Sequence, residues 1–287
     1  MSREKSSQPL VSIIMPTYNA GQTLKRCLAS VQSQTYSNIE LIVVDRGSSD
    51  QTRLIAESYG CRVLEAGCER TSQFNFGARS AKGDYIYYIG SDFLLDPLIV
   101  EKAVAAAQET GADAVVVPNQ SDASISFWAS VRALERGTYA NDSLMEAARF
   151  FSKDAYFAVG GYDDTMVAYE EHDLHNRLVL SGYTCARIEG AGEVHIGEPR
   201  SLSEIARKHF YYGRSIAKYV RKYPAKAIVQ LAPVRMSYLR HWKDFVLHPV
   251  LTCGFVVYQV TRYGAAGLAL SLTLATEMIV GRRRGQR

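Results

Sequence analysis

Two aspartates stand directly after apolar, strand-like runs. Asp45 closes the run at 41–44, and Asp92 follows the run at 85–89 after a Gly-Ser pair. In an open α/β sheet, ligands bind beyond the carboxyl ends of the strands, so we expect both carboxylates in one crevice. A carboxylate there can accept hydrogen bonds from a base or a ribose, and the spacing therefore predicts a nucleotide pocket with Asp45 on its floor.

The first apolar run, at residues 11–15, also leads into a polar loop. That loop comprises Pro16, Thr17, Tyr18 and Asn19. After Asp45, Gly47 and two serines including Ser48 let the backbone turn, and Asp50 is placed to cap the next helix. The alternative interpretation is two buried strands with ordinary caps.

The elements that must position these loops are predicted from the hydrophobic pattern. Strands are expected near 10–15, 39–44, 61–65, 84–89 and 113–117, alternating with helices near 21–33, 50–59, 71–80 and 97–109. Further on we expect helices at 124–136, 153–159, 170–180 and 202–222, and strands at 147–151, 183–188 and 193–196. The alternation predicts right-handed βαβ units and an α/β fold.

Composition agrees with one such domain plus an appendage. The chain has 287 residues, of which 47% are hydrophobic and 22% charged, with disorder expected only at residues 1–9. Its five cysteines form no CxxC pair, which indicates neither a disulfide framework nor a zinc site and favours a reducing, cytosolic setting. The N-terminal apolar run is too short for the core of a signal peptide.

Charge is distributed unevenly. Residues 200–287 hold 16 Lys and Arg against three acids, so they carry +13, and residues 1–199 carry −9 of the net +4. No nucleic-acid motif accompanies the basic residues. Their interleaving with Tyr and Trp at 201–243 instead favours basic amphipathic helices on an anionic membrane surface.

The residues that follow, 244–287, contain two apolar stretches and end in a basic tail. The stretches, at 245–260 and 263–280, are separated by Arg262, and each is slightly short for a hydrocarbon core. A hairpin, one tilted span with an interfacial partner, and two interfacial helices are all open. Basic flanks on both sides favour a hairpin or monotopic anchor on the cytoplasmic face. Packing of these helices on the enzyme domain as ordinary core is the alternative.

The ordered motifs resemble a known family. They are Pro16-Thr-Tyr-Asn19, Val44-Asp45 with Gly-Ser-Ser-Asp50, Asn75-Phe-Gly77, Gly83-Asp-Tyr, Ser91-Asp92, Gly160-Gly-Tyr-Asp163 and Glu170-Glu-His-Asp-Leu174. Over residues 10–200 the chain resembles the nucleotide-binding half of glycosyltransferase family 2, the inverting GT-A-type enzymes. The resemblance implies a Rossmann-like, mostly parallel sheet flanked by helices, followed here by C-terminal amphipathic and hydrophobic helices.

The resemblance also implies a nucleotide-diphosphate sugar as donor. The expected nucleotide contacts are Pro16, Thr17, Tyr18, Asn19, Asp45, Gly47, Ser48, Asn75 and Ser91. Asp92 matches the last acid of the family's Asp-x-Asp metal motif, whose first acid is replaced by Gly90. One carboxylate together with diphosphate oxygens and water can still hold Mg²⁺ or Mn²⁺, and His195 is a candidate further ligand that suits Mn²⁺ better.

In the resembled family, an acid at the start of a helix takes the proton of the acceptor hydroxyl. Here that position is Glu171, and Glu170 is the neighbour most easily confused with it. Simple capping of the helix dipole is the alternative role for both acids.

Two departures concern the diphosphate. Arg46 stands where the family commonly has a second Asp, and Phe74 stands where a cation often precedes Asn-x-Gly. Replacement cations are expected among Arg70, Arg207, Lys208 and Arg214, for which membrane-surface charge is the alternative role.

We therefore expect an inverting glycosyltransferase that works at the cytoplasmic membrane surface. A lipid-linked glycan or polyprenyl-phosphate acceptor would present its oxygen at headgroup height, where Arg207, Lys208, Tyr212 and Arg214 could meet it. A nucleotidyltransferase is disfavoured because residues 16–22 lack a basic Gly-rich loop. A non-catalytic, nucleotide-sugar-binding member is the other alternative. Sugar, base, acceptor and oligomeric state stay open.

Overall fold

The computed structural model describes residues 8–67, 69–140, 142 and 144–284. Most of the N-terminus expected to be disordered, residues 1–7, and the end of the basic tail, residues 285–287, lie outside the described residues. The chain forms two compact units. We call them the α/β unit (Met1–Gln120, Glu146–Asp164 and Glu170–Gly197) and the helical unit (Ser121–Met145, Thr165–Tyr169 and Glu198–Arg287). The helical unit thus takes in two segments that lie before the boundary expected near residue 200.

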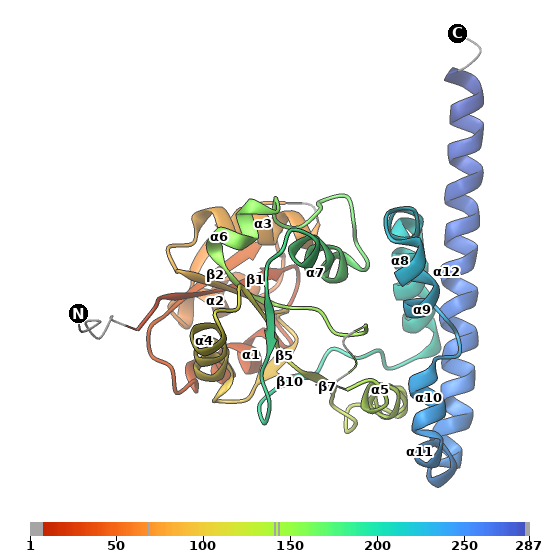
Figure 1. Ribbon diagram of the computed structural model, residues 1–287, viewed down its shortest axis with the longest axis horizontal. Coiled ribbons are helices and arrows are strands. Elements are labelled where there is room, and N and C mark those ends of the chain that lie inside the picture. Colours follow the sequence, from red (N-terminus) through yellow and green to blue (C-terminus); the bar gives the residue numbers. More distant parts are fainter. Residues whose placement is uncertain (1–7, 68, 141, 143, 285–287) are drawn as a thin grey trace. The chain divides into compact units, whose positions relative to one another are not determined.

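The α/β unit is built on a seven-stranded sheet of mostly parallel strands (Figure 1). Its order is β3 (Arg62–Glu65), β2 (Ile39–Asp45), β1 (Val11–Thr17), β4 (Tyr85–Tyr88), β8 (Phe150–Ser152), β6 (Ala114–Val116) and β9 (Cys185–Arg187). Only β8 runs antiparallel to its neighbours. A second sheet has the order β5 (Phe93–Leu95), β10 (Glu193–His195) and β7 (Asn119–Ser121). The expected α/β class is confirmed, although β5 and β7 were not expected.

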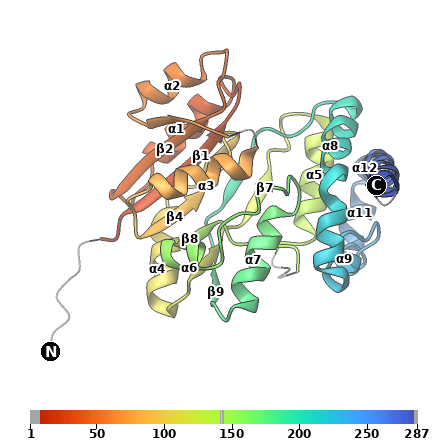
Figure 2. The same cartoon turned by 90° about the horizontal axis from the view of Figure 1, so that it is seen from above.

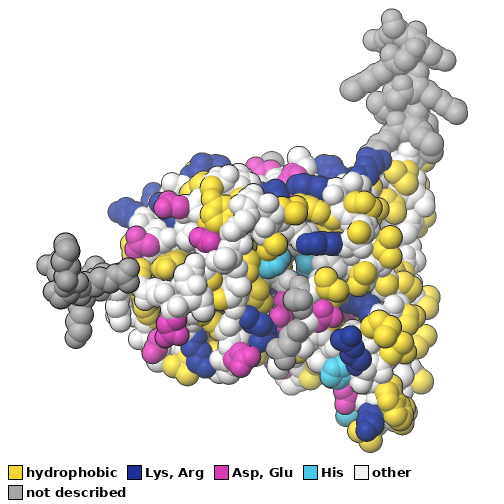
Figure 3. All heavy atoms as spheres, in the orientation of Figure 1, with side chains coloured by type: hydrophobic (Ala, Val, Ile, Leu, Met, Phe, Trp, Pro, Cys, Tyr) yellow, Lys and Arg dark blue, Asp and Glu magenta, His cyan; other side chains and the backbone are white. Residues whose placement is uncertain are grey.

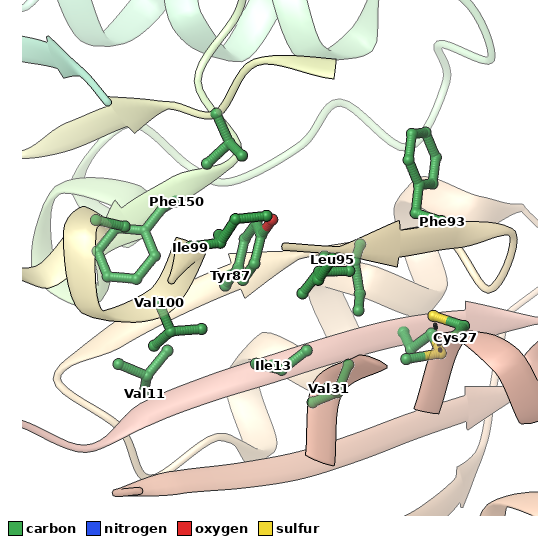
Figure 4. Close-up of a cluster of buried hydrophobic side chains, with 14 of the residues drawn as sticks. Val11, Ile13, Cys27, Val31, Tyr87, Phe93, Leu95, Ile99, Val100 and Phe150 are labelled. Carbon is green, nitrogen blue, oxygen red and sulfur yellow. Dashed lines mark hydrogen bonds between the residues drawn. The ribbon is translucent and has the colours of Figure 1, made fainter. Parts of the chain in front are cut away.

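Strand side chains alternate between two cores, one on each face of the large sheet. Val11, Ile13 and Tyr87 enter the first core, where Figure 4 shows them with Phe150 and with Cys27 of a covering helix. Its helices are α1 (Leu24–Gln32), α2 (Thr52–Ser58) and α4 (Ile99–Thr110). The opposite core lies beneath α3 (Arg70–Ser80), α6 (Lys153–Ala158) and α7 (Glu170–Leu180). The sheet is therefore covered on both faces, as parallel sheets require.

Helix α3 lies directly on β1 and β2 (Figure 2). A Cβ at Gly77 would come within 2.5 Å of Ile14 Cγ2 and 2.9 Å of Val44 Cγ2. Any side chain there would push the helix off the sheet. The glycine of the Asn75-Phe-Gly77 motif thus has a packing role.

The helical unit consists of long and short helices around a small core. They are α5 (Phe127–Gly137), α8 (Leu202–Lys222), α9 (Pro224–Gln230), α10 (Met236–Arg240), α11 (Trp242–Leu247) and α12 (Pro249–Arg284). Helix α12 packs along α8 and against α5, and Val131, Ile205 and Tyr258 are buried where they meet. This corresponds to the expectation of C-terminal amphipathic and hydrophobic helices.

The hairpin, one of the arrangements expected for the two apolar stretches, does not form. Helix α12 continues from Pro249 to Arg284 without a turn. Arg262, which appeared to divide the stretches, is largely buried, and its Nη1 lies 3.1 Å from Glu135 Oε1. A cation that is paired inside the helical unit need not interrupt a helix. Among the described residues, no helix combines the length and apolar character that a membrane span needs.

Candidate active site

The carboxyl ends of β1 and β2 lie side by side in the α/β unit. The strands pair in parallel, with Thr17 opposite Asp45. The buried Asp45 carboxylate accepts hydrogen bonds from Thr17 Oγ1 at 2.8 Å, Ser48 N at 2.7 Å and Ser48 Oγ at 2.6 Å. Asp45 therefore lies buried at this edge of the sheet, and its hydrogen bonds fix the conformation of the loop after β2. Its direct contact with a nucleotide stays a prediction.

Asn19 ties the two loops together. Its backbone N–H donates to Ser48 Oγ at 2.8 Å, and its Oδ1 accepts from Ser49 N at 2.9 Å. Asn19 has φ 48° and Gly47 has φ 75°, both in the left-handed region that Asn and Gly adopt most easily. The residue types of both loops thus follow from the backbone they must form.

Tyr18 presents an aromatic ring beside these loops. Its side chain is 56% exposed, and the guanidinium carbon of Arg46 lies 5.0 Å from the ring centroid. Pro16 is the buried penultimate residue of β1. An exposed ring beside a cation is a surface on which a planar base can stack.

Asn75 lies on α3, inside the α/β unit. Its Nδ2 donates to Tyr162 O at 2.8 Å and to Asp164 Oδ1 at 2.6 Å, and its Oδ1 accepts from Tyr162 N and Tyr156 OH. The structure uses this amide to hold the Gly160–Asp164 loop. A contact of Asn75 with the nucleotide stays a prediction.

Asp92 and His195 are brought together although they are 103 positions apart. Asp92 Oδ2 lies 3.0 Å from His195 Nε2. The cause is the antiparallel pairing of β5 with β10, which places His195 opposite Phe93. Asp92 follows Ser91 in the turn after β4 and is 35% exposed, whereas the His195 side chain is 8% exposed.

Two glycines leave room for the Asp92 carboxylate. A Cβ at Gly197 would lie 2.2 Å from Asp92 Oδ2, and a Cβ at Gly90 would lie 2.7 Å from Oδ1. Gly90, which replaces the first acid of the motif, thus lies in a tight turn that packs against the second acid, Asp92.

This pair can be compared with what a divalent cation needs. No set of three or more His, Cys, Asp and Glu within the described parts of the chain could hold a metal ion. Neighbouring ligands of an octahedral ion at about 2.1 Å lie about 3 Å apart, which matches the Asp92–His195 distance. Two protein ligands suffice for an ion that keeps waters and binds substrate phosphates. The residues fit Mg²⁺ or Mn²⁺ on those terms, and the imidazole favours Mn²⁺.

The two acids at the start of α7 have different surroundings. Glu170 is buried, with a 5% exposed side chain, and is ion-paired with Arg70. Glu171 is 23% exposed, and its Oε1 lies 3.5 Å from Arg149 Nε. Of the two carboxylates, Glu171 is the one that a substrate can reach more easily.

The other expected cation positions divide between the two units. Arg70 is placed in the α/β unit by its pairing with Glu170, and Phe74 is fully buried among Tyr88 and Tyr162, so position 74 cannot supply a phosphate contact. Four expected residues lie on α8 in the helical unit: Arg207 and Arg214 are exposed, and Lys208 and Tyr212 are half-buried. Their contact with an acceptor stays a prediction.

Sequence analysis missed several residues around the site. Gln73 donates to Thr17 O at 2.9 Å and to Val44 O at 2.7 Å, and so joins α3 to the ends of β1 and β2. Arg149 and Glu193 form a buried ion pair. The signal for Glu193 was its spacing of two from His195, which puts both on one face of β10. Nothing in the local sequence marked Arg149.

Comparison with known proteins adds the family. A model described as glycosyl transferase family 2 matches residues 12–160. An uncharacterised glycosyltransferase of Rickettsia typhi is 37% identical over 107 residues, which are 36% of this chain and 33% of that protein. Glycosyltransferase GlyG of Streptococcus pneumoniae is 26% identical over 223 residues, 71% of this chain and 65% of that protein. The matches thus span between a third and two thirds of these relatives.

The fold is also similar to that of a solved glycosyltransferase. Mannosyltransferase PcManGT from Pyrobaculum calidifontis, solved in complex with GDP-Man and Mn²⁺, superposes with a TM-score of 0.59 at 16% identity, over 98% of this chain and 82% of that one. The likeness extends over both the motif-bearing strands and the helices that follow them. Because the family model covers more than half of the residues, this chain belongs to glycosyltransferase family 2.

Proposed function

We propose that the protein is an inverting glycosyltransferase that moves a sugar from a nucleoside-diphosphate donor to a lipid-linked acceptor at the cytoplasmic face of a membrane. The observation that carries the proposal is the Asp92–His195 pair, 3.0 Å apart in a chain of this family. The GDP-Man and Mn²⁺ bound by PcManGT support the same donor class. The acceptor and the membrane rest on separate observations in the helical unit.

For the donor, the loops after β1 and β2 offer complementary parts. The exposed ring of Tyr18, flanked by Arg46, gives the base a stacking surface. Asp92 and His195 would hold Mg²⁺ or Mn²⁺, which would neutralise charge developing on the diphosphate. The Asp92 side chain is 35% exposed, so its carboxylate is accessible from solvent to phosphate oxygens.

For the transfer, Glu171 is the general base. The acceptor oxygen bonds to the anomeric carbon as the bond from that carbon to the diphosphate oxygen breaks. The acceptor proton passes to the Glu171 carboxylate, and the nucleoside diphosphate leaves. Glu170 is unsuited to this role because it is buried and already paired with Arg70.

For the membrane, the helical unit carries a large exposed apolar surface, which we call the apolar face. Figure 3 shows hydrophobic side chains gathered along α12. The apolar face comprises Ile228, Val234, Met236, Leu239, Trp242, Val246, Leu247, Val250, Val256, Val257, Val260, Leu268 and Leu272. On α12 the successive members are six, one, three, eight and four positions apart, which at about 100° per residue keeps them within about half of the helix circumference.

Exposed basic residues in the helical unit favour a lipid bilayer as the partner of the apolar face. Arg221, Lys222, Arg240 and Lys243 are exposed in the same unit. Anionic headgroups attract each nearby Lys or Arg by about 1 kcal/mol, and Trp242 suits the interface. Exposed apolar surfaces rimmed by polar residues mark sites of contact with proteins or membranes.

Donor hydrolysis tests the catalytic part. The full chain is incubated with UDP-, GDP- and dTDP-sugars in Mn²⁺, Mg²⁺ or EDTA, alongside Asp92→Ala and Glu171→Gln. We expect metal-dependent release from one donor, loss in Asp92→Ala, and a fall of about 10²- to 10⁴-fold in Glu171→Gln. Asp154→Ala, at an exposed acid in the first turn of α6, is the matched control. No release from any donor, with or without lipid extract, would favour a non-catalytic nucleotide-sugar-binding protein.

Vesicle sedimentation tests the membrane part. We expect the chain to sediment with phosphatidylcholine vesicles that contain phosphatidylglycerol, and much less with phosphatidylcholine alone. Leu247→Glu, on the apolar face, should reduce binding, whereas Leu54→Glu on α2, at a similarly exposed leucine, should not. Equal binding of both variants would count against this surface as the membrane contact.

A further inference from the structure

Arg149 is a buried arginine held in the middle of the large sheet. It directly precedes β8, and its backbone bonds to both neighbouring strands: its N–H donates to Val115 O at 3.2 Å, and its carbonyl accepts from Tyr88 N at 2.9 Å. Its side chain is only 9% exposed. A buried guanidinium that lacked partners would cost several kcal/mol, so its contacts explain why it is tolerated.

Those contacts reach the proposed base on one side. Arg149 Nε lies 3.5 Å from Glu171 Oε1 at the start of α7. Burial lowers the pKa of the Arg149 guanidinium, but Glu171 and Glu193 outweigh burial and raise that pKa above its ordinary value. The guanidinium is therefore charged at every working pH. A fixed cation beside a carboxylate favours the ionised form, which a general base requires.

On the other side, Arg149 reaches the strands that carry the metal-site pair. Its Nη1 is ion-paired with Glu193, which also accepts a hydrogen bond from Tyr87 OH at 2.5 Å. Its Cζ lies 4.9 Å from the ring centroid of Phe93, and that ring lies 4.7 Å from the His195 ring. Phe93 directly follows Asp92 along the chain.

We infer that Arg149 is a positioning residue that keeps the Glu171 carboxylate ionised and sets its place relative to Asp92 and His195. One side chain, anchored in the sheet, touches the base and both strands of the pair. The inference rests on the proposed function, because it takes Glu171 as the base.

Other groups also face Glu171 and bear on its charge. Tyr88 of β4 and Tyr162 of the loop after α6 both interact electrostatically with it. Glu170 is adjacent in sequence and is ion-paired with Arg70. Among the residues whose contacts with Glu171 are described, Arg149 is the cation in direct ion-pair distance. Its removal therefore changes the charge beside the base most directly.

The test measures donor hydrolysis by the full chain, with water as acceptor, in Arg149→Met and Arg149→Lys. In Arg149→Met we expect kcat to fall at least tenfold, with KM for the donor changed less than threefold. The acidic limb of the profile of kcat against pH should move about one unit towards neutrality. Arg149→Lys, which keeps the charge, should retain most of the wild-type kcat and leave the acidic limb close to its wild-type position. Wild-type kcat and an unmoved limb in Arg149→Met would refute the inference.

A double-mutant cycle separates positioning from general damage. If Arg149 acts through Glu171, Arg149→Met should have less than a twofold effect on kcat in the Glu171→Gln background. The same tenfold fall in both backgrounds would refute the inference while leaving the proposed function intact. Wild-type hydrolysis by Glu171→Gln would refute the proposed base, and the inference with it. Thermal unfolding of each variant identifies a loss of activity that comes from misfolding.

Discussion

Replacing Glu135 by Gln should destabilise the helical unit severely. The Glu135 side chain, on α5, is completely buried. Its carboxylate contacts three guanidinium groups, from Arg132, Arg235 and Arg262, and accepts a hydrogen bond from Tyr238 OH at 2.9 Å. An amide is nearly the same size but carries no charge, so the variant would leave three buried cations facing a neutral group.

The size of this effect follows from the pKa of Glu135 and, independently, from the general cost of breaking a buried ion pair. Burial alone would raise the pKa of Glu135, but the three arginines outweigh it and lower the pKa from 4.5 to about 2. Such a change corresponds to about 3 kcal/mol in favour of the charged form. Removal of one partner from a buried ion pair costs about 3 to 5 kcal/mol. Because the folded pKa is the lower one, this stabilisation is present above about pH 4.5 and is lost as the pH falls towards 2.

Urea unfolding followed by tryptophan fluorescence measures the loss. Both tryptophans of the chain, Trp128 and Trp242, lie in the helical unit, so the signal reports that unit. With an m-value of about 2 kcal/mol/M, a loss of about 3 kcal/mol lowers the midpoint by about 1.5 M. Glu65→Gln is the control, because the Glu65–Arg53 pair is exposed and contributes less than about 1 kcal/mol. A midpoint for Glu135→Gln within 0.3 M of wild type, about 0.6 kcal/mol at this m-value, would refute the reasoning.

Three further predictions concern other sites. Gly197→Ala places a Cβ against the Asp92 carboxylate, so the Mn²⁺ concentration for half-maximal donor hydrolysis should rise about tenfold; an unchanged requirement would exclude Asp92 as a ligand. Burial and nearby cations lower the pKa of His209 to about 3, so below about pH 6.5 the unfolded chain binds a proton that the folded chain does not. Stability should therefore fall by about 1 kcal/mol between pH 7.5 and 5.5, and His209→Gln should lose less than wild type over the same range in urea unfolding. Gly213→Ala brings a Cβ within 2.4 Å of a backbone oxygen of α12 and should cost about 1 to 3 kcal/mol in the same assay, whereas Gly264→Ala, which meets nothing within 4 Å, should not destabilise.

Much of the α/β unit could be predicted from local sequence. The apolar runs that become β1 and β2 each end at a polar loop, and the helices expected at 71–80, 97–109 and 170–180 form close to those bounds. Strand β7 was missed because Asn-Gln-Ser carries no apolar residue, and β5 was missed because it begins only five positions after the end of β4.

The helical unit was less predictable. Residues 249–280 of its two expected apolar stretches lie in one helix, α12, because Arg262 is neutralised by a partner 127 positions away on α5. A cation in an apolar sequence normally marks exposure, and the sequence alone gives no sign that a buried carboxylate awaits it. The same limit applies to Arg149, whose two acidic partners lie on α7 and β10.

The sequence by itself determined which chemical groups the site contains: the loops around Asp45, the acid Asp92, the candidate ligand His195 and the acids at the start of α7. These follow from residue type and from the ends of local elements. Only the tertiary structure decided how the groups are used. The antiparallel register of β5 and β10 sets the distance between Asp92 and His195, and burial with Arg70 separates Glu170 from the more accessible Glu171. Distances and burial depend on which distant segments pack together, and a local pattern does not contain that information.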